Sequence, residues 1–267
     1  NTVKPPGNAK NTISVGAADN DKVASFSSRG PTNDGRIKPD VIAPGVSVTS
    51  ARSQVGKGAC SSVDPRNGNY SLCSGTSMAT PAVSGLATLV REYFQKEEDH
   101  VNPSAALVKA TLINGARPNG YGLMSAEAGW GFVDIARSLP DKNRRLEFVD
   151  ELYLPLTTGE TYEVMVDHVG SVEPLTATLV WTDYPGQVDS SRALVSDLNL
   201  VVRGSDGSVF YGNDFVGAMD DQADSVNNVE KVKVKNPSAA SYTVEVVAAN
   251  TPMGPQNFAL VWTYAHS

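Results

Sequence analysis

The chain has 267 residues, of which 40% are hydrophobic and 19% are charged, and its formal net charge is −7. That composition is ordinary for a globular protein of one large domain or two smaller ones. The acidic balance argues against nucleic acid as a partner, because phosphates would be repelled. No apolar run approaches the roughly 20 residues that span a bilayer, so a membrane partner is not expected either. The chain begins with Asn1 rather than Met, and we expect it to be a piece of a longer polypeptide.

The first 55 residues predict strands and loops of an α/β fold. Residues 12–15 and 41–43 are short β-rich runs, and we expect Gly16 to end the first of them. Three charged side chains in this part are interpreted as ties between loops rather than as catalytic groups: Arg29, Lys38 and Asp40.

Two cysteines, Cys60 and Cys73, flank a polar loop in a chain that has no other cysteine. This pattern favours a disulfide and an oxidising compartment. Closing such a loop contributes on the order of 3 kcal/mol in the chain-entropy model. The alternative is two separate buried thiols. A disulfide would brace the approach to the segment that follows.

In that segment, residues 75–81 (GTSMATP), a glycine turn precedes Ser77 and an apolar run with helical spacing follows it. Ser77 is therefore expected at or near a helix N-terminus. Near a helix N-terminus, free N–H groups and the helix dipole favour a developing negative charge, as a nucleophile of acyl transfer requires. The alternative is that Ser77 is only an N-cap. We expect Pro81 in the first turn, where its missing N–H costs no hydrogen bond. The apolar face of the helix is predicted from six residues at helical spacing: Ala79, Val83, Leu86, Ala87, Val90 and Phe94.

Two more helices are predicted in the same half of the chain. Asn102 is expected to be an N-cap with Pro103 at the first helical position. The helix should run to about Asn114, with Gly115 as its stop. Residues 129–139 predict a last, short helix.

The pattern changes after residue 140, where a charged linker precedes segments with apolar residues at every second position. Residues 205–207 (Ser-Asp-Gly) are typical of a hairpin turn. Because no helical pattern interrupts these segments, they indicate an antiparallel β-sandwich of the jelly-roll type. We therefore predict an α/β domain over residues 1–140 and an all-β domain over residues 141–267. The clearest alternations are Ala177/Leu179/Trp181 and Leu198/Leu200/Val202.

Five segments resemble motifs of the subtilisin-like serine proteases, in the order in which that family carries them. The resemblance covers about residues 5–139 and implies part of a subtilisin-like parallel-sheet domain. It is greatest to secreted alkaline subtilases with a C-terminal β-sandwich. One departure is Ala82, where most of the family has a histidine. The segments are residues 11–17 (NTISVGA), 26–31 (FSSRGP), 38–45 (KPDVIAPG), 75–81 (GTSMATP) and 129–134 (GWGFVD).

The resemblance implies a secreted endopeptidase that hydrolyses peptide bonds of a protein or peptide substrate through an acyl-enzyme on Ser77. It assigns Gly75 and Thr76 to substrate binding. A wall of the primary specificity pocket would come from the first residues of the chain: Val3, Lys4 and Pro5.

The stretch from residue 183 to 224 is acidic, with eight aspartates against two arginines. Such a composition favours Ca²⁺, which takes six to eight oxygen ligands, although no window matches the twelve-residue calcium loop. Solvated surface acidity is the alternative. The resembling proteins with this β domain bind calcium, which implies at least one ion here. The candidate ligands are Asp183, Asp197, Asn199 and Asp214.

The sequence does not contain the other groups on which the family's chemistry depends. None of its three histidines, His100, His168 and His266, precedes Gly-(Thr/Ser), and no Asp-(Thr/Ser)-Gly segment or oxyanion asparagine segment is present. A serine hydroxyl is a poor nucleophile without a histidine to take its proton. We therefore expect the chain alone to be inactive and to need the N-terminal part of the catalytic domain as a partner. The incomplete sheet would expose an edge through which two copies could also form a dimer.

A different class of function is a non-catalytic binding or structural module with a remnant protease half. In that case four aromatic side chains would form an exposed platform: Tyr184, Phe210, Tyr211 and Phe215. The alternative for these residues is packing into a core. Binding to glycans would distinguish the module from the enzyme.

Overall fold

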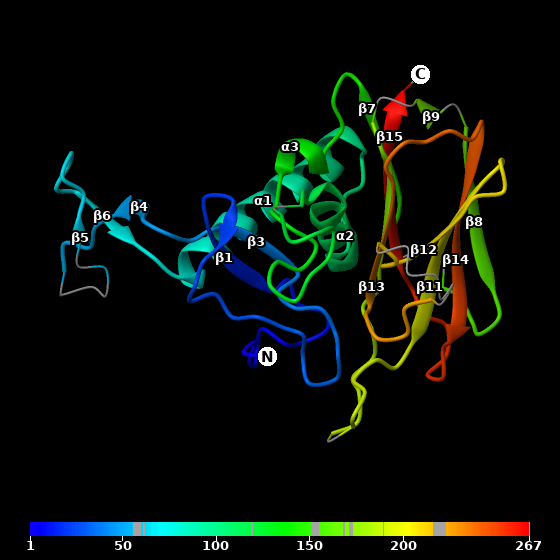
Figure 1. Cartoon of the computed structure of the whole chain (residues 1–267), viewed down its shortest axis with the longest axis horizontal. Coiled ribbons are helices and arrows are strands. Elements are labelled where there is room, and N and C mark those ends of the chain that lie inside the picture. The colour runs from blue at the N-terminus through cyan, green and yellow to red at the C-terminus, as the bar shows by residue number, and fades with distance from the viewer. Residues whose placement is uncertain are drawn as a thin grey trace.

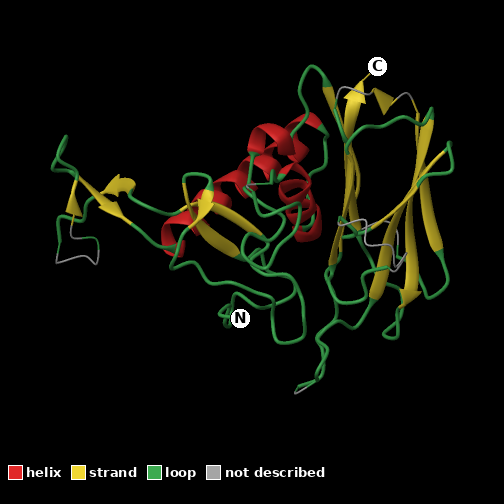
Figure 2. Cartoon of the chain, in the orientation of Figure 1, coloured by secondary structure: helices red, strands yellow, loops and turns green. Residues whose placement is uncertain are grey.

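The computed structural model describes residues 1–55, 60, 62–118, 120–150, 155–167, 169–170, 173–188, 190–215 and 223–266. Over these residues the chain forms an α/β part from its first half and a two-sheet β part from its second half, side by side (Figure 1). Helices lie between the small first sheet and the β part (Figure 2). None of the helices in the described residues is both long and apolar enough to cross a bilayer.

The first sheet is built on two parallel strands, β1 (Val15–Asp19) and β3 (Val41–Pro44). A short strand, β2 (Lys22–Val23), pairs antiparallel with the end of β1. Gly16 was expected to end the first run but lies inside β1. A Cβ there would approach side-chain atoms of Ile42, Pro39 and Ser27 to 3.0 Å, so the position needs a small residue for close packing.

Helix α1 (Thr76–Glu97) packs on β1 and β3. Its buried face confirms the predicted stripe: Ala79, Val83, Val90 and Phe94 are buried, and Leu86 and Ala87 pack partly buried against the same core.

Helix α2 (Ala105–Gly115) begins later than predicted, because its N-cap is Ser104 rather than Asn102. The Ser104 hydroxyl accepts a hydrogen bond from the Leu107 N–H at 3.0 Å, which leaves Pro103 outside the helix. Gly115 is the last helical residue and not a stop beyond the helix. A Cβ there would lie 2.3 Å from the Ser138 hydroxyl oxygen, so this glycine allows close contact between helices.

Helix α3 (Ile135–Ser138) is much shorter than the predicted 129–139. The preceding residues instead pair with the first sheet. The Trp130 N–H donates to the Asp40 carbonyl at 2.9 Å, and Phe132 bridges to Ile42. Asp134 then caps the single turn of α3 by accepting from the Arg137 N–H.

Between β3 and α1 the chain leaves the body as a separate three-stranded antiparallel sheet (Figure 1). Its strands are β4 (Val48–Ala51), β5 (Ser62–Val63) and β6 (Tyr70–Cys73), in the order β4-β6-β5. We call residues 48–73 the arm.

The second half contains two antiparallel sheets. One has the order β13-β10-β15-β7, with β9 pairing to β15, and the other has the order β12-β11-β14-β8. The strands are β7 (Arg144–Val149), β8 (Thr161–Asp167), β9 (Val169–Gly170), β10 (Leu175–Val180), β11 (Asp197–Gly204), β12 (Val209–Tyr211), β13 (Val229–Val234), β14 (Ser241–Asn250) and β15 (Ala259–His266).

A single hydrophobic core lies between these two sheets. The predicted alternations supply it from both sides, with Leu179 and Trp181 from one sheet and Leu198 and Leu200 from the other, all fully buried. The predicted hairpin at 205–207 joins β11 to β12, and Gly207 has the positive φ of 87° that the turn needs. The β-sandwich expectation is therefore confirmed at the level of two packed antiparallel sheets.

Helix α2 joins the two halves by packing against β10 and β15. The Asn114 carboxamide lies between two strands: its oxygen accepts from the Thr178 hydroxyl and its nitrogen donates to the Thr263 hydroxyl, both at 2.9 Å. The Lys231 ammonium donates to the Ile113 carbonyl at 2.7 Å, at the C-terminal end of α2 where the helix dipole favours a cation. Burial lowers the pKa of Lys231 well below its usual range.

Candidate active site

Ser77 lies in the first turn of α1, with its side chain exposed. Its backbone N–H belongs to the first four of the helix, which have no partner within the helix and lie at the positive end of the dipole. No described residue forms a hydrogen bond with the Ser77 hydroxyl. Pro81 lies beyond the first turn, because α1 begins at Thr76. The expectation for Pro81 was therefore wrong: its missing N–H leaves the Ser77 carbonyl without the usual partner four residues on.

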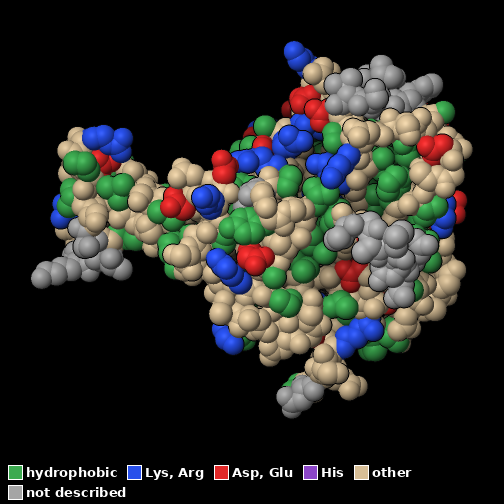
Figure 3. Space-filling model, viewed as in Figure 1, with side chains coloured by type: hydrophobic (Ala, Val, Ile, Leu, Met, Phe, Trp, Pro, Cys, Tyr) green, Lys and Arg blue, Asp and Glu red, His purple; other side chains and the backbone are tan. Residues whose placement is uncertain are grey.

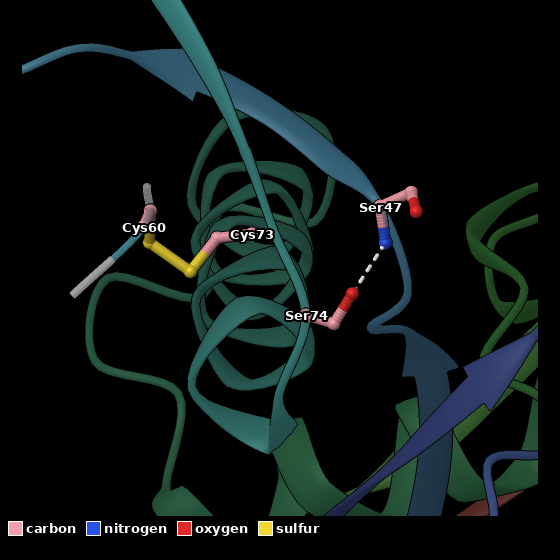
Figure 4. The surroundings of a disulfide bond; sticks show 4 residues. All are labelled: Ser47, Cys60, Cys73 and Ser74. Atoms are coloured by element: carbon pink, nitrogen blue, oxygen red, sulfur yellow. Dashed lines mark hydrogen bonds between the residues drawn. A yellow bond between two sulfur atoms is a disulfide. The ribbon is translucent and has the colours of Figure 1, made fainter. Parts of the chain in front are cut away.

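The approach to Ser77 is tied to the end of β3. The Gly75 N–H donates to the Gly45 carbonyl at 2.7 Å. A Cβ at Gly45 would lie 2.6 Å from the Ala17 Cβ and 2.9 Å from the Gly75 carbonyl oxygen, so only glycine permits this contact. The Ser47 N–H donates to the Ser74 hydroxyl at 2.9 Å (Figure 4). These contacts fix the backbone two and three residues before Ser77.

A disulfide lies on the other side of Ser74. The sulfurs of Cys60 and Cys73 are bonded, with their Cα atoms 5.1 Å apart (Figure 4). Cys73 ends β6, four residues before Ser77. The bond therefore closes the base of the arm next to the start of α1.

A pocket of about 150 Å³ opens beside Thr76. Of the residues that the resemblance assigned to substrate binding, Val3, Lys4 and Thr76 line this pocket, whereas Gly75 and Pro5 adjoin lining residues without lining it themselves. The full lining is Val3, Lys4, Gly7, Ser14, Val15, Ser28, Pro39 and Thr76.

A buried ionic cluster holds one wall of this pocket. The Asp40 carboxylate accepts from the Lys38 ammonium at 2.6 Å and from the Ser14 N–H at 2.7 Å, and the Lys109 ammonium lies 3.0 Å away. Ser14 and Pro39, which line the pocket, are thereby fixed. Lys38 and Asp40 have the structural role expected of them. Lys109 was missed, although it is the single charged residue in the otherwise uncharged sequence of α2.

The cluster shifts the pKa values of its members. Burial acts to raise the pKa of Asp40, but the charges of Lys109 and Lys38 outweigh it and the pKa is lowered. Burial, helped by the charge of Lys109, lowers the pKa of Lys38 to about 7 against the opposing effect of Asp40.

Of the three histidines, His100 is the one whose side chain the structure describes, and it is far from Ser77. Helix α1 has 22 residues and is therefore about 33 Å long, with Ser77 at one end and His100 beyond the other. The His100 ring contacts the Asp150 carboxylate, whose Oδ2 also accepts from the Ser104 N–H at 3.0 Å. His168 lies outside the described residues, as does the side chain of His266. The described part of the chain thus offers Ser77 no proton acceptor.

The four candidate calcium ligands do not form one site. The buried Asp183 carboxylate accepts from the Lys10 ammonium at 2.5 Å and from the N–H groups of Val195 and Ser196 at 2.9 and 2.8 Å. Asp183 therefore ties the first half to the sandwich. Asp214 is exposed. Within the described ranges, no three Asp, Glu, His or Cys side chains are grouped so that they could hold a metal.

Three buried side-chain oxygens nearby have no hydrogen-bond partner among the described residues: Asp197 Oδ1, Asn199 Oδ1 and Glu230 Oε1. Asp197 and Asn199 are two residues apart on β11 and so share one face. The other Glu230 oxygen accepts from the Leu200 N–H at 2.7 Å. Burial foremost, and then the charges of Asp224 and Asp197, raise the pKa of Glu230 well above its usual value. Glu230 was not among the predicted ligands.

The four aromatic residues predicted as a binding platform do not form one surface. Phe210 packs against the sandwich core, and Phe215 packs against the core of the first half. These two side chains therefore follow the alternative of core packing.

Comparison with known proteins places these features in a family. Residues 1–131 match the model of the subtilase family. The serine protease/ABC transporter B family protein tagB of Dictyostelium discoideum is 31% identical over 308 residues, which cover 90% of this chain and 16% of that protein. The serine protease AprX of Bacillus subtilis is 40% identical over 154 residues, covering 52% of this chain and 32% of AprX. The chain thus spans about a sixth of the length of the first of these relatives.

Among solved structures, fervidolysin from Fervidobacterium pennivorans, a keratinolytic enzyme related to subtilisin, aligns with a TM-score of 0.41 and 20% identity. The alignment covers 85% of this chain and 27% of fervidolysin.

Proposed function

This chain belongs to the subtilase family through residues 1–131, and we propose that it is the nucleophile-bearing part of a secreted serine endopeptidase. The observation that carries the proposal is the exposed Ser77 at the start of α1, beside a pocket of about 150 Å³. The Ser77 hydroxyl attacks the scissile carbonyl to form an acyl-enzyme, and the Ser77 N–H helps to hold the oxyanion.

The proton of Ser77 needs an acceptor. The side chains of the described residues supply none, and the resemblance implies that the general base, its orienting carboxylate and the second oxyanion donor belong to the N-terminal part of the catalytic domain. In subtilisin, where the effect was established, loss of a triad member costs roughly 10⁴–10⁶-fold in turnover. The chain alone is therefore close to inert.

The pocket beside Thr76 receives a substrate side chain on the acyl side of the scissile bond. Val3 and Lys4 form its wall, Pro5 supports that wall from the next position, and Gly75 and Thr76 form the rim next to Ser77. The support for this assignment is that Val3 and Lys4 line one pocket together with Thr76, which is distant from them in sequence.

The open side of the first sheet receives the N-terminal part of the catalytic domain. Among the described residues, β1 is covered on that side only by the two-residue β2. An uncovered edge strand is a template for another chain. A dimer through the same edge is the competing occupant.

The sandwich, residues 141–267, is a jelly roll. In support, successive long strands alternate between the two sheets, and the orders β13-β10-β15-β7 and β12-β11-β14-β8 interleave early and late strands. The domain boundary lies near residue 140, between the end of α3 at Ser138 and the start of β7 at Arg144.

The sandwich binds Ca²⁺ at Asp197 and Asn199, with Glu230 in place of Asp183 and Asp214. In support, each of these residues has a buried oxygen without a partner among the described residues, and a hard cation, which takes oxygen ligands, would compensate such burial. Asp183 does not fit, because its oxygens are already occupied by Lys10 and two N–H groups.

The experiment that tests the enzyme mixes this chain with the N-terminal part of the catalytic domain and adds a serine-directed phosphonate. We expect a single label, on Ser77, and no label on a Ser77→Ala chain. Ser84→Ala, at another exposed serine of α1, is the matched control and should be labelled normally. Labelling at another residue, or no labelling of the reconstituted protein, would contradict the proposal.

A further inference from the structure

The arm lies outside the hydrophobic cores of the molecule. None of the described side chains of residues 48–73 belongs to a hydrophobic core. Figure 3 shows the arm as a knob set apart from the rest of the surface. Apolar side chains on it face water, with exposed fractions of 89% for Val55, 41% for Val63 and 43% for Tyr70. Ordering such a segment costs conformational entropy that no core burial offsets.

The described strands of the arm are nevertheless tied together. The Cys60–Cys73 disulfide closes its base, and the buried Asp64 carboxylate accepts two hydrogen bonds from the Arg66 side chain, at 2.7 and 3.0 Å. A surface held in place before binding loses less entropy when a partner arrives. The arm therefore has the properties of a preformed binding element.

One edge of the arm is free and leads toward the nucleophile. Among the described residues β4 pairs only with β6, and its last three residues are exposed. The Arg52 N–H donates to the Asn69 carbonyl at 2.8 Å. Hydrogen bonding alternates along an antiparallel pair, so the N–H groups of Thr49 and Ala51 point away from β6. The first residue of β4 directly follows Ser47, whose N–H donates a hydrogen bond to the Ser74 hydroxyl. Ser74 is three residues before Ser77.

The arm is also basic in an acidic chain. Residues 48–73 contain Arg52, Lys57 and Arg66 against Asp64 alone, whereas the whole chain has a net charge of −7. Asp64 neutralises Arg66. Arg52 remains as an exposed cation directly after β4, and Lys57 lies outside the described residues. The chemistry complementary to this edge is an extended, acidic polypeptide.

We propose that the arm is an exosite for the polypeptide substrate. An extended segment that flanks the scissile bond adds to the free edge of β4, its backbone bonding to Thr49 and Ala51 while an acidic side chain pairs with Arg52. The inference rests on the proposed function, because the occupant is the substrate of Ser77. The continuity of β4 with the Ser77 site distinguishes this occupant from an unrelated partner.

The test uses the complete enzyme, that is, this chain together with the rest of its catalytic domain. Ala51→Pro removes one outward N–H of β4 without breaking a bond to β6. Val63→Pro is the matched control, because it removes the outward N–H of β5 on the opposite edge. We expect Ala51→Pro to raise KM about five- to tenfold for a protein substrate, with kcat and the hydrolysis of a four-residue chromogenic peptide unchanged. Val63→Pro should change neither.

Charge gives a second measurement. Arg52→Glu should lower kcat/KM for an acidic extended peptide about tenfold and raise it for a basic one, again without effect on the short peptide. Equal losses for Ala51→Pro and Val63→Pro, or a parallel loss on the short peptide, would overturn the exosite. Failure of the unmodified complete enzyme to cleave the short peptide would instead reject the proposed function itself.

Discussion

The two halves of the molecule differ in how their hydrophobic cores are assembled. Over the described residues, the core of the sandwich draws only on residues of the second half. The core beneath α1 and α2 draws on both halves, because Val180 and Val261 of the sandwich belong to it together with Leu107 and Val83. The core of the sandwich is therefore self-contained over the described residues, whereas the half that carries Ser77 depends on the sandwich for part of its core.

The largest expected effect tests this dependence. Trp181→Ala removes a fully buried side chain from the sandwich core and should lower the free energy of unfolding by about 3–5 kcal/mol. Hydrogen exchange should then show loss of protection in α1 as well as in the sandwich. Phe94→Ala is the converse variant, and it should expose α1 while β11 and β14 stay protected. If both variants lost hydrogen-exchange protection equally in α1 and in the sandwich, the proposed difference between the halves would be wrong.

A smaller effect is expected at the polar contact between the halves. Asp183→Ala leaves the Lys10 ammonium without its anion and two buried N–H groups without acceptors. The free energy of unfolding should fall by about 2–3 kcal/mol, measured by urea denaturation. The exposed Asp214 serves as control, and Asp214→Ala should change stability by less than about 0.5 kcal/mol. Equal values would show that Asp183 does not tie the halves together.

Calcium should stabilise the sandwich further. At tenfold excess over Kd, binding to the folded state contributes about 1.4 kcal/mol, visible as a rise in Tm on adding Ca²⁺ after chelation. Asn199→Ala and Glu230→Gln should abolish the rise, and Asp214→Asn should keep it. If Asp214→Asn abolished the rise in Tm instead, the result would support the sequence-based assignment, in which Asp214 is a ligand.

The smallest effect concerns pH and the first half alone. Burial lowers the pKa of Lys38 to about 7 in the folded state, below the ordinary 10.5 of the unfolded chain. The unfolded chain therefore binds more protons between these values, so stability from this group rises with pH from about 7 to 10.5. The slope stays below about 1.4 kcal/mol per pH unit, the limit for one proton. Lys38→Met should flatten it in denaturation curves, and Lys22→Met, at an exposed lysine, should not.

Patterns that depend on neighbouring residues were predictable from the sequence. The stripe from Ala79 to Phe94 and the alternations of the sandwich reflect helix and strand periods, which repeat within each element. The turn at Gly207 needs only its own backbone conformation. The motif around Ser77 also predicted that a helix begins there, as α1 does.

Features set by contacts between distant segments were not predictable. Gly16 reads as a strand end until Ile42 and Pro39 are placed beside it. Glu230 reads as a solvent-facing residue, yet it shares the parity of Val232 and Val234, whose side chains are in the core. Lys109 has its partner Asp40 far away in sequence. In each case the deciding neighbour comes from another element.

Helix α1 also connects the position of Ser77 to the sandwich. At its far end Phe94 packs edge-on against Phe148 of β7, with ring centroids 4.7 Å apart, and His100 contacts Asp150 just beyond that strand. Because the helix is about 33 Å long, a tilt of about 2° at this anchor displaces Ser77 by about 1 Å. A misplacement of that size costs about a hundredfold in rate. Under the proposed function, the sandwich therefore helps to position the Ser77 hydroxyl from the opposite end of the helix.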